Sequence, residues 1–279
     1  MKKYTEKDFE TFERDEQGWL ICPSGDYTKI KDFPEKCNFG SGSRFGKGCN
    51  FDRWIRFGEK CSFGDGCNFG PGSIFEIYND FGNNNNFGKG CRFSLYIAFG
   101  DGNKFGEGSE FAEGNKFGSQ NVFGAWCKFG REEEFIGGNT FGMGASFQAK
   151  CKFGVLNAFQ KNSEFSDYCE FGDESSFGTM SYFGKGCTFS IDCNFGGKSY
   201  FSEYCRFGSG NKFGNGSDFD RDCTFHEECS FGDENSFGLM NNFREKCSFG
   251  DGNIFGDYCV FDEGITFGED NEFGKKMPV

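Results

Sequence analysis

A phenylalanine stands at every sixth position from Phe39 to Phe273, forty times in succession without an insertion or a substitution. Glycine follows the phenylalanine in twenty-six of the forty hexads, and the residue two positions before it is nearly always Cys, Asn or Ser. A repeat this strict restricts the chain to a stack of similar short units, each of which buries its apolar side against its neighbours. The sequence therefore predicts a solenoid.

Phenylalanine supplies most of the apolar mass of a chain that is only 36% hydrophobic overall. Each buried Phe side chain contributes roughly 1.5–3 kcal/mol relative to an exposed one, so the repeat can form an ample core. Repeated Phe-Gly dipeptides also occur in disordered low-complexity segments. Such segments have no need to hold a six-residue phase from Phe39 to Phe273, so the strict phase indicates an ordered chain.

Within each hexad, we expect the phenylalanine and the residue two positions before it to point inward, because side chains alternate along a strand. The second and third residues after the phenylalanine are rich in Gly, Asp, Lys and Ser, for example Asp65-Gly66 and Lys89-Gly90. These residues are typical of turns. Each hexad is therefore predicted to be a short strand followed by a corner.

Identical inward residues recur at intervals of eighteen, that is, in every third hexad. Parallel strands in register favour such stacking of identical side chains. Three hexads per turn predict an all-β fold, a single-stranded parallel β-helix with three sides and about fourteen coils. The two clearest series are Cys151, Cys169, Cys187, Cys205 and Cys223, and Asn85, Asn103, Asn121, Asn139 and Asn157.

The hexad F-G-x-x-[CNS]-x over residues 37–273 resembles the hexapeptide repeat of left-handed parallel β-helices. That repeat combines an aliphatic residue, Gly, two variable positions and a small residue. Phe in place of Leu, Ile or Val, and frequent Cys or Asn at the small position, depart from the family pattern. The resemblance implies a left-handed coil, although parallel crossovers are otherwise right-handed. It also raises an enzymatic alternative, because many members are acyltransferases that use a histidine base.

The residues do not favour that alternative. The single histidine, His226, directly follows a repeat phenylalanine, and no loop interrupts the repeat to form a substrate pocket. The cysteine series from Cys151 to Cys223 lines one wall, and the repeats contain no CxxC pair, which argues for packing as small hydrophobes instead of metal binding. We therefore expect a non-enzymatic variant of the family, with no catalytic residues, no metal site and no cofactor.

Three segments are expected along the chain. Residues 1–18 are predicted to form a short helical segment, with Thr5 as its N-cap and Asp8 in its first turn, that covers the first coil. Residues 19–274 form the solenoid, with an atypical first coil over 19–36 in which Ile21, Tyr27 and Phe33 continue the inward phase. Residues 275–279 form a tail. Its Lys275, Lys276 and Pro278 are typical of residues that blunt an open sheet edge, and docking of that end on another chain is the alternative.

One predicted corner collects aromatic and apolar residues at the third position after the phenylalanine. These residues are predicted to form an edge suited to protein contacts, although they could instead pack on the backbone of a neighbouring coil. We call this set the corner column. It consists of Tyr78, Tyr96, Tyr168, Tyr204, Met240 and Tyr258.

Glu133 is the clearest exception to the inward pattern, because it occupies the position that Cys, Asn or Ser normally takes. A buried carboxylate without a partner is destabilising. Either the strand bulges at Glu133 and releases the side chain, or the side chain accepts a hydrogen bond from a donor such as the Asn115 amide. We predict the bulge.

Charge and cysteine usage restrict the partners and the compartment. The chain is acidic, with a formal net charge of −13. An acidic surface lacks the basic footprint for direct nucleic-acid binding but can attract basic or DNA-binding proteins. Fifteen of the sixteen cysteines take inward positions. No apolar signal core and no apolar run long enough to span a membrane occur. These features predict reduced, buried thiols in a cytoplasmic protein without membrane contact.

The most direct functional prediction is a non-catalytic, rigid, acidic β-solenoid that acts as an interaction scaffold for a protein partner. Two alternatives stay open besides the acyltransferase. Outward carboxylates could mimic DNA and inhibit a nucleic-acid-binding protein, although Lys and Arg interrupt them. The chain could also assemble with itself, through a solenoid face or through the C-terminal coil.

Overall fold

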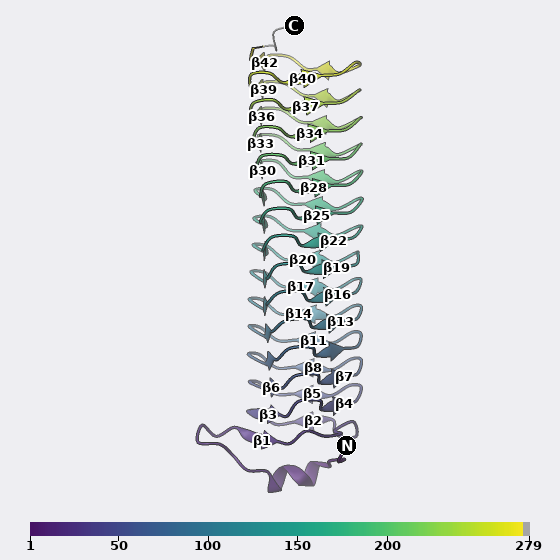
Figure 1. The fold of residues 1–279 in the computed structure, drawn as a ribbon, viewed down its shortest axis with the longest axis vertical. Coiled ribbons are helices and arrows are strands. Elements are labelled where there is room, and N and C mark those ends of the chain that lie inside the picture. Colours follow the sequence, from purple (N-terminus) through teal and green to yellow (C-terminus); the bar gives the residue numbers. More distant parts are fainter. Residues whose placement is uncertain (276–279) are drawn as a thin grey trace. The chain divides into compact units, whose positions relative to one another are not determined.

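The computed structural model describes residues 1–275, which divide into two compact units: unit 1, residues 1–142, and unit 2, residues 143–275. Each unit is a parallel β-solenoid in which the chain passes through three sheets in turn (Figure 1). Forty-two short strands occur in the described residues, three to a turn, or about fourteen turns in the two units together. The predicted all-β, three-sided fold is confirmed.

Unit 1 contains three sheets, S1, S2 and S3, and one short helix, the 3₁₀ helix η1 (Glu6–Thr11). In order of hydrogen-bonded neighbours, S1 consists of β1 (Leu20–Cys22), β3 (Cys37–Phe39), β6 (Arg56–Phe57), β9 (Ile74–Phe75), β12 (Arg92–Phe93), β15 (Glu110–Phe111) and β18 (Lys128–Phe129). S2 consists of β4 (Arg44–Phe45), β7 (Ser62–Phe63), β10 (Asp80–Phe81), β13 (Ala98–Phe99), β16 (Lys116–Phe117) and β19 (Glu134–Phe135). S3 consists of β2 (Asp32–Phe33), β5 (Asn50–Phe51), β8 (Asn68–Phe69), β11 (Asn86–Phe87), β14 (Lys104–Phe105), β17 (Val122–Phe123) and β20 (Thr140–Phe141).

Unit 2 contains three further sheets, S4, S5 and S6. S4 consists of β21 (Ser146–Phe147), β24 (Glu164–Phe165), β27 (Tyr182–Phe183), β30 (Tyr200–Phe201), β33 (Asp218–Phe219), β36 (Ser236–Phe237), β39 (Ile254–Phe255) and β42 (Glu272–Phe273). S5 consists of β22 (Lys152–Phe153), β25 (Glu170–Phe171), β28 (Thr188–Phe189), β31 (Arg206–Phe207), β34 (Thr224–Phe225), β37 (Asn242–Phe243) and β40 (Val260–Phe261). S6 consists of β23 (Ala158–Phe159), β26 (Ser176–Phe177), β29 (Asn194–Phe195), β32 (Lys212–Phe213), β35 (Ser230–Phe231), β38 (Ser248–Phe249) and β41 (Thr266–Phe267).

The core of each unit is built from stacked phenylalanine rings. Parallel pairing places each phenylalanine on the one eighteen residues away, as Phe87 on Phe105 in S3, where the ring centroids lie 4.8 Å apart and the planes differ by 1°. Phenylalanine rings of neighbouring sheets meet edge to face. The centroids of the Phe87 and Phe93 rings, for example, lie 5.1 Å apart and the ring planes differ by 85°. Both geometries are favoured for aromatic pairs, so one residue type fills the interior without voids.

The inward Asn, Cys and Ser residues satisfy the backbone of the corners. In S3, the Oδ1 atom of Asn103 accepts a hydrogen bond from the backbone N–H of Asn85 at 2.8 Å, and its Nδ2 donates to the Gly100 carbonyl at 2.8 Å. Cysteine donates more weakly, as the Cys223 thiol does to the Ser202 carbonyl at 3.4 Å. Buried backbone groups need such partners, which explains why the inward position takes small polar side chains. Fourteen of the fifteen cysteines predicted to point inward are buried, and Cys259 is half-buried. Cys22, which lies outside the predicted set, is buried as well.

Glycine follows the phenylalanine because successive coils lie very close at that point. A Cβ atom added to Gly106 would come within 2.6 Å of the carbonyl carbon of Gly88 in the preceding coil. Contacts of that length do not occur between real Cβ atoms. The Phe-Gly dipeptide therefore combines a core side chain with the close approach of two backbones.

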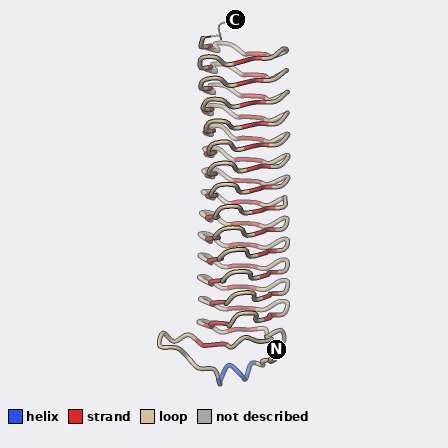
Figure 2. The backbone as a smooth tube through the Cα atoms, in the orientation of Figure 1, coloured by secondary structure: helices blue, strands red, loops and turns tan. Residues whose placement is uncertain are grey.

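The corners place one residue per hexad in the left-handed region. Gly108 adopts φ +66°, but many corners place a larger residue there, as Glu174 does at φ 56°. Figure 2 draws the corners as loops between the short strands. Left-handed backbone disfavours any residue with a Cβ by roughly 1–2 kcal/mol, so these corners store local strain.

Replacing exposed Glu174 by Gly is expected to raise the free energy of unfolding by about 0.5–1 kcal/mol, because Gly relieves the left-handed strain but loses more entropy on folding. Glu174→Ala removes the same charge without relieving the strain and should not stabilise unit 2. Thermal melting followed by circular dichroism would compare the two. Equal melting temperatures for the Gly and Ala variants would contradict the argument.

The first coil departs from the predicted phase. Tyr27 and Phe33 are buried as expected, but Ile21 is 45% exposed, so its inward assignment is wrong. Leu20 and Cys22 are buried instead, and Cys22 pairs with Phe39. This shift buries two apolar side chains on β1. It also leaves Trp19 on the outer side, where its ring contacts the guanidinium of Arg56 at 4.0 Å.

The N-terminal residues contain the predicted helical turn, although it is a 3₁₀ helix, η1. Thr5 precedes it, and both the backbone N–H and the hydroxyl of Thr5 donate to the Asp8 carboxylate, at 2.6 and 2.8 Å. Tyr4 stacks on Tyr27 at 4.9 Å, and Phe9 meets Phe33 edge to face at 5.9 Å. These contacts suit the predicted covering role of residues 1–18.

Glu133 does not cause a bulge, so that prediction is wrong. The next residues, Glu134 and Phe135, keep the regular register with Lys116 and Phe117. Glu133 is fully buried, and its Oε1 atom accepts a hydrogen bond from the Asn115 amide at 3.2 Å. The regular strand survives because one donor is present on the preceding coil.

The predicted boundary at residue 274 and the tail remain predictions. Lys275 is exposed, whereas Lys276 and Pro278 lie outside the described residues. Over residues 1–275, the structure contains no helix with the length and apolar character needed to cross a membrane.

Candidate interaction surface

The structure places the two unit 1 residues of the corner column side by side. Tyr78 and Tyr96 are 50% and 49% exposed, and their rings stack at 5.5 Å with planes 16° apart. A Cβ atom on Gly114 would come within 2.7 Å of the Tyr96 ring, so that ring also lies against the next corner. Part of each ring therefore packs on unit 1 and part is available to solvent.

The residues of the corner column in unit 2 do not form one cluster. Tyr168 lies over Gly186 of the next coil. Tyr204, two coils after Tyr168, lies beside the ammonium of Lys185, whose Nζ atom is 4.8 Å from the centroid of the Tyr204 ring. Exposed Met240 and half-buried Tyr258 follow at later corners. The column therefore contains separate aromatic contacts. Its role as a continuous interaction edge stays a prediction.

All six members of the corner column adopt positive φ between 56° and 64°. Bulky residues rarely take this conformation, because the Cβ atom approaches the backbone. Glycine takes the same corner position elsewhere, as in Gly114 and Gly186. Lys, Glu, Asp and Asn residues take the same conformation at other corners, so positive φ belongs to the corner position in general and not to the column alone.

A second pair of tyrosines lies on the outer face of S4 in unit 2 and was missed by the sequence analysis. Tyr182 and Tyr200 pair directly across β27 and β30, and their rings stack at 5.1 Å with planes 9° apart. Tyr182 is 47% exposed, and Tyr200 is half-buried. The signal was present in the sequence, because the two tyrosines are eighteen residues apart and each directly precedes a repeat phenylalanine.

Two carboxylates flank this pair in the same outward row. Glu164 pairs with Tyr182 on one side, and Asp218 pairs with Tyr200 on the other. We call the row of Glu164, Tyr182, Tyr200 and Asp218 the tyrosine ladder. Neither carboxylate forms an ion pair within residues 1–275, whereas Glu110 of S1 lies between Arg92 and Lys128, at 3.4 and 3.5 Å.

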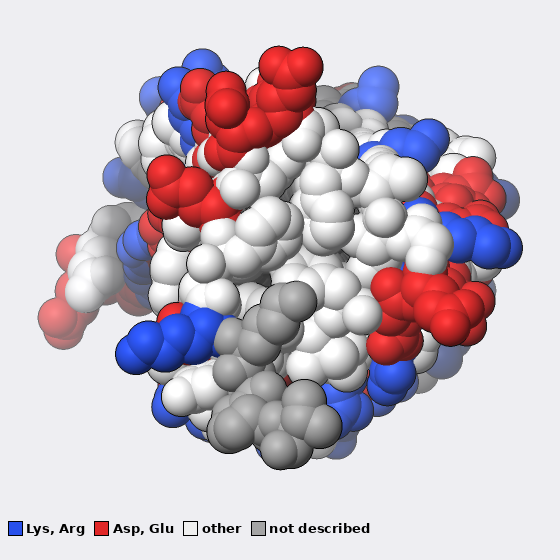
Figure 3. Space-filling view, turned by 90° about the horizontal axis from the view of Figure 1, so that it is seen from above, with Lys and Arg blue, Asp and Glu red and all other residues white. Residues whose placement is uncertain are grey.

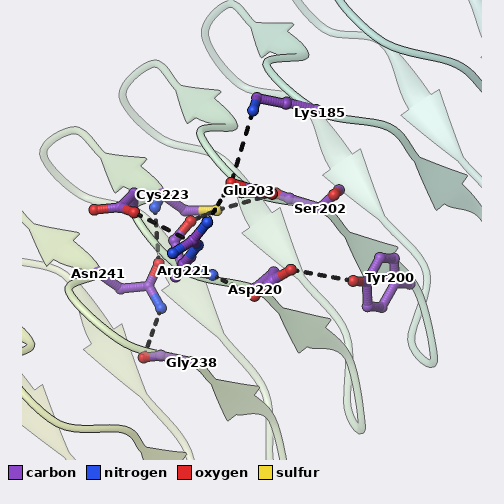
Figure 4. A network of polar contacts seen from close by, with 10 residues as sticks. Lys185, Tyr200, Ser202, Glu203, Asp220, Arg221, Cys223, Gly238 and Asn241 are labelled. Carbon is purple, nitrogen blue, oxygen red and sulfur yellow. Dashed lines mark hydrogen bonds and ion pairs between the residues drawn. The ribbon is translucent and has the colours of Figure 1, made fainter.

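Asp220 supports the ladder from the strand end. The Tyr200 hydroxyl donates to its Oδ2 atom at 3.4 Å, while Oδ1 accepts from the Arg221 backbone N–H at 2.8 Å (Figure 4). Partial burial and the nearby negative charge of Asp220 raise the pKa of Tyr200. Its hydroxyl therefore stays protonated as a donor, and the orientation of the ring is fixed.

The neighbouring corner carries a network of opposite charges. The Glu203 carboxylate lies 3.1 Å from Arg221 and 3.8 Å from Lys185 (Figure 4). The same carboxylate raises the pKa of the Arg221 guanidinium. Lys185 also contacts the Tyr204 ring. These cations are already paired, so they do not neutralise Glu164 and Asp218.

His226 and the cysteines are the residues that the sequence offers for catalysis or metal binding. His226 is exposed, with its Nδ1 atom 3.9 Å from Glu227. Burial raises the pKa of Cys61 to about 11 and of Cys91 to about 12, so these two thiols are protonated at neutral pH. Among the described residues, no three His, Cys, Asp or Glu side chains are arranged to hold a metal ion.

A hollow lies on the last coil of unit 2. Its volume is about 580 Å³, and Phe261, Phe267 and Phe273 are among the residues that line it. Viewed from this end, charged side chains of both signs surround an uncharged centre (Figure 3).

The fold and the repeat define a class, that of the parallel β-solenoid repeat proteins with a phenylalanine core. No protein-family model and no curated protein matches the chain. Any function must therefore be argued from the surface of the solenoid itself.

Proposed function

We propose that this chain is a non-catalytic binding protein that presents outward side chains of its solenoid to a protein partner. The observation that carries the proposal is the tyrosine ladder of S4, two stacked tyrosines that remain accessible on an acidic chain. Tyrosines are enriched at protein interfaces, where they supply large contact areas at low entropic cost. The corner column, with its exposed tyrosines, supports the same function.

We further propose that the chain is a relative of the hexapeptide-repeat β-helices with the left-handed coil of that family. Support comes from three hexads per turn and a small residue two positions before nearly every core residue. Phenylalanine in every core position would make it an unusual member.

DNA mimicry has less support. A mimic needs carboxylates concentrated on one side, whereas on S1 Glu110 alternates with Arg92 and Lys128. On S2 and S5 the same alternation appears in the pairs Lys116–Glu134 and Lys152–Glu170. Neutralised rows of this kind do not imitate a phosphate backbone.

Affinity capture with matched variants tests the binding function. We expect Tyr182→Ser combined with Tyr200→Ser to lose the proteins that the wild type enriches from an extract of the source cells. Val155→Ser combined with Leu156→Ser is the control. These two residues are also exposed apolar residues of unit 2, but they lie at a corner and not on the outer face of S4. Quantitative mass spectrometry would compare the three proteins. The same enriched set for all three would overturn the role of the tyrosine ladder.

A further inference from the structure

We infer that the tyrosine ladder is a docking site for an extended basic segment of a partner protein, with two cationic side chains four residues apart. The inference rests on the proposed binding function and deepens it by assigning the chemistry of the partner. It follows from the order of the four outward side chains, in which a carboxylate, two stacked rings and a second carboxylate succeed one another.

The ring geometry creates two places for a cation. Because Tyr182 and Tyr200 stack on each other, the second face of Tyr182 is directed to the coil of Glu164 and that of Tyr200 to the coil of Asp218. A cation over a tyrosine face is attracted by the ring quadrupole. A carboxylate on the adjacent coil adds a direct ion pair at the same place.

The charges of Glu164 and Asp218 are available for this purpose. Neither carboxylate has an ion-pair partner within residues 1–275, and the nearby cations Lys185 and Arg221 are bound to Glu203. The net charge of −13 would attract a basic partner before contact. Local and long-range charge therefore favour the same class of ligand.

The spacing restricts the ligand further. Glu164 and Asp218 lie three coils apart, about 14 Å at the usual separation of about 4.8 Å between strands. An extended chain advances roughly 3.3 Å per residue, so residues i and i+4 are about 13 Å apart. Residue i+2 points to the same side and would lie over the outer edges of the two tyrosine rings. The predicted motif is basic-x-apolar-x-basic.

Cross-strand aromatic pairs also stabilise a sheet without any ligand. Stabilisation of the sheet alone would explain the contact between Tyr182 and Tyr200, but it gives no role to the unpaired carboxylates of Glu164 and Asp218 on either side. The two readings differ in the effect of Glu164 and Asp218, because only the docking site loses affinity when both charges are removed.

The test uses the full chain and two fluorescent peptides of equal composition. One has the sequence Lys-Ser-Leu-Ser-Lys, and the other, Lys-Lys-Ser-Leu-Ser, places the two lysines next to each other. Fluorescence anisotropy at low and high salt is expected to show tighter binding of the spaced peptide. Glu164→Gln combined with Asp218→Asn should weaken that binding about tenfold and reduce its dependence on salt.

Matched variants make the outcome decisive. Glu76→Gln combined with Asp80→Asn removes two exposed carboxylates from unit 1 and should leave the affinity unchanged. Tyr182→Phe combined with Tyr200→Phe keeps both ring faces and should retain binding, whereas the corresponding Leu variants should lose it. Equal weakening by both charge-removing pairs, or equal affinity for the two peptides, would overturn the inference.

The two proposals can fail separately. Capture of a protein that depends on Tyr182 and Tyr200, together with no preference for the spaced peptide, would refute the basic motif and leave the binding function standing. Preference for the spaced peptide without any ladder-dependent capture would support the docking chemistry and refute the ladder as the main partner site.

Discussion

Replacing Phe165 by Ala is expected to lower the free energy of unfolding of unit 2 by about 3–5 kcal/mol, the usual cost of truncating a buried Phe. Phe165 is fully buried in β24. Its ring stacks on Phe147 and Phe183, both at 5.0 Å, and meets Phe159 and Phe171 edge to face at 4.9 Å. The cavity would therefore open in the middle of the aromatic stack, where every neighbouring ring is fixed by its own contacts.

The effect should remain local at first. In a solenoid each repeat contacts only its neighbours, so stability is approximately a sum of repeat and interface terms. Hydrogen exchange measured by mass spectrometry is suitable, because it resolves peptides that contain β21, β24 and β27. Faster exchange in these strands than in β36 is the expected result for Phe165→Ala.

Phe273→Ala provides the matched control. Phe273 belongs to the same repeat but is 52% exposed on β42, so the same truncation removes much less buried area. We expect a loss well below that of Phe165→Ala. Equal losses for the two variants would show that the repeat phenylalanine acts through local strand propensity and not through its stacked contacts.

The regular part of the fold could be predicted because one physical requirement repeats in every hexad. Parallel pairing in steps of eighteen residues superimposes Phe87 on Phe105 and Asn85 on Asn103, and the sequence shows both series directly. Side-chain alternation then assigns every inward and outward position. This arrangement buries the repeat phenylalanines of the inner coils, whereas Phe267 and Phe273 on the last coil are exposed.

The exceptions could not be predicted, because they depend on contacts that a periodic pattern does not contain. The shift that buries Cys22 in place of Ile21 is accompanied by an outer contact between Trp19 and Arg56. The regular strand at Glu133 depends on a single amide, that of Asn115. Both require the position of one side chain relative to another.

The candidate site was predicted only in part. The sequence indicated aromatic residues at the corners, and the structure places Tyr78 on Tyr96 as a stacked pair. The tyrosine ladder was overlooked because Tyr182 and Tyr200 occupy ordinary outward positions, where most hexads carry charged or small residues. Their significance depends on the absence of ion pairs at Glu164 and Asp218, which only the structure shows for the described residues.

Unit 1 is expected to lose stability as the pH rises, because Glu133 carries a buried carboxyl group. Burial raises the pKa of Glu133 well above its ordinary value, and the hydrogen bond from Asn115 opposes this shift only in part. Its Oε2 atom has no hydrogen-bond partner among residues 1–275. The protonated form is therefore the one that the folded state accommodates.

The direction in which the free energy of unfolding changes with pH follows from proton linkage. The folded state binds the Glu133 proton more tightly than the unfolded chain, so this group favours folding most below its unfolded-state pKa of roughly 4.3. Above that value the contribution falls by about 1.4 kcal/mol per pH unit, until the pH passes the raised pKa of the folded state. The loss should therefore cover the weakly acidic range and continue toward neutrality.

Urea unfolding from about pH 5 to about pH 8, followed by tryptophan fluorescence, would measure this dependence. Glu133→Gln keeps an oxygen for the Asn115 amide but cannot ionise, so the variant should be less sensitive to pH and more stable than the wild type near neutrality. Glu134→Gln is the control, since it removes a neighbouring carboxylate that is exposed and lies 2.9 Å from Lys116. If Glu133→Gln and Glu134→Gln changed the pH dependence equally, the effect would belong to surface charge and not to the buried carboxyl group.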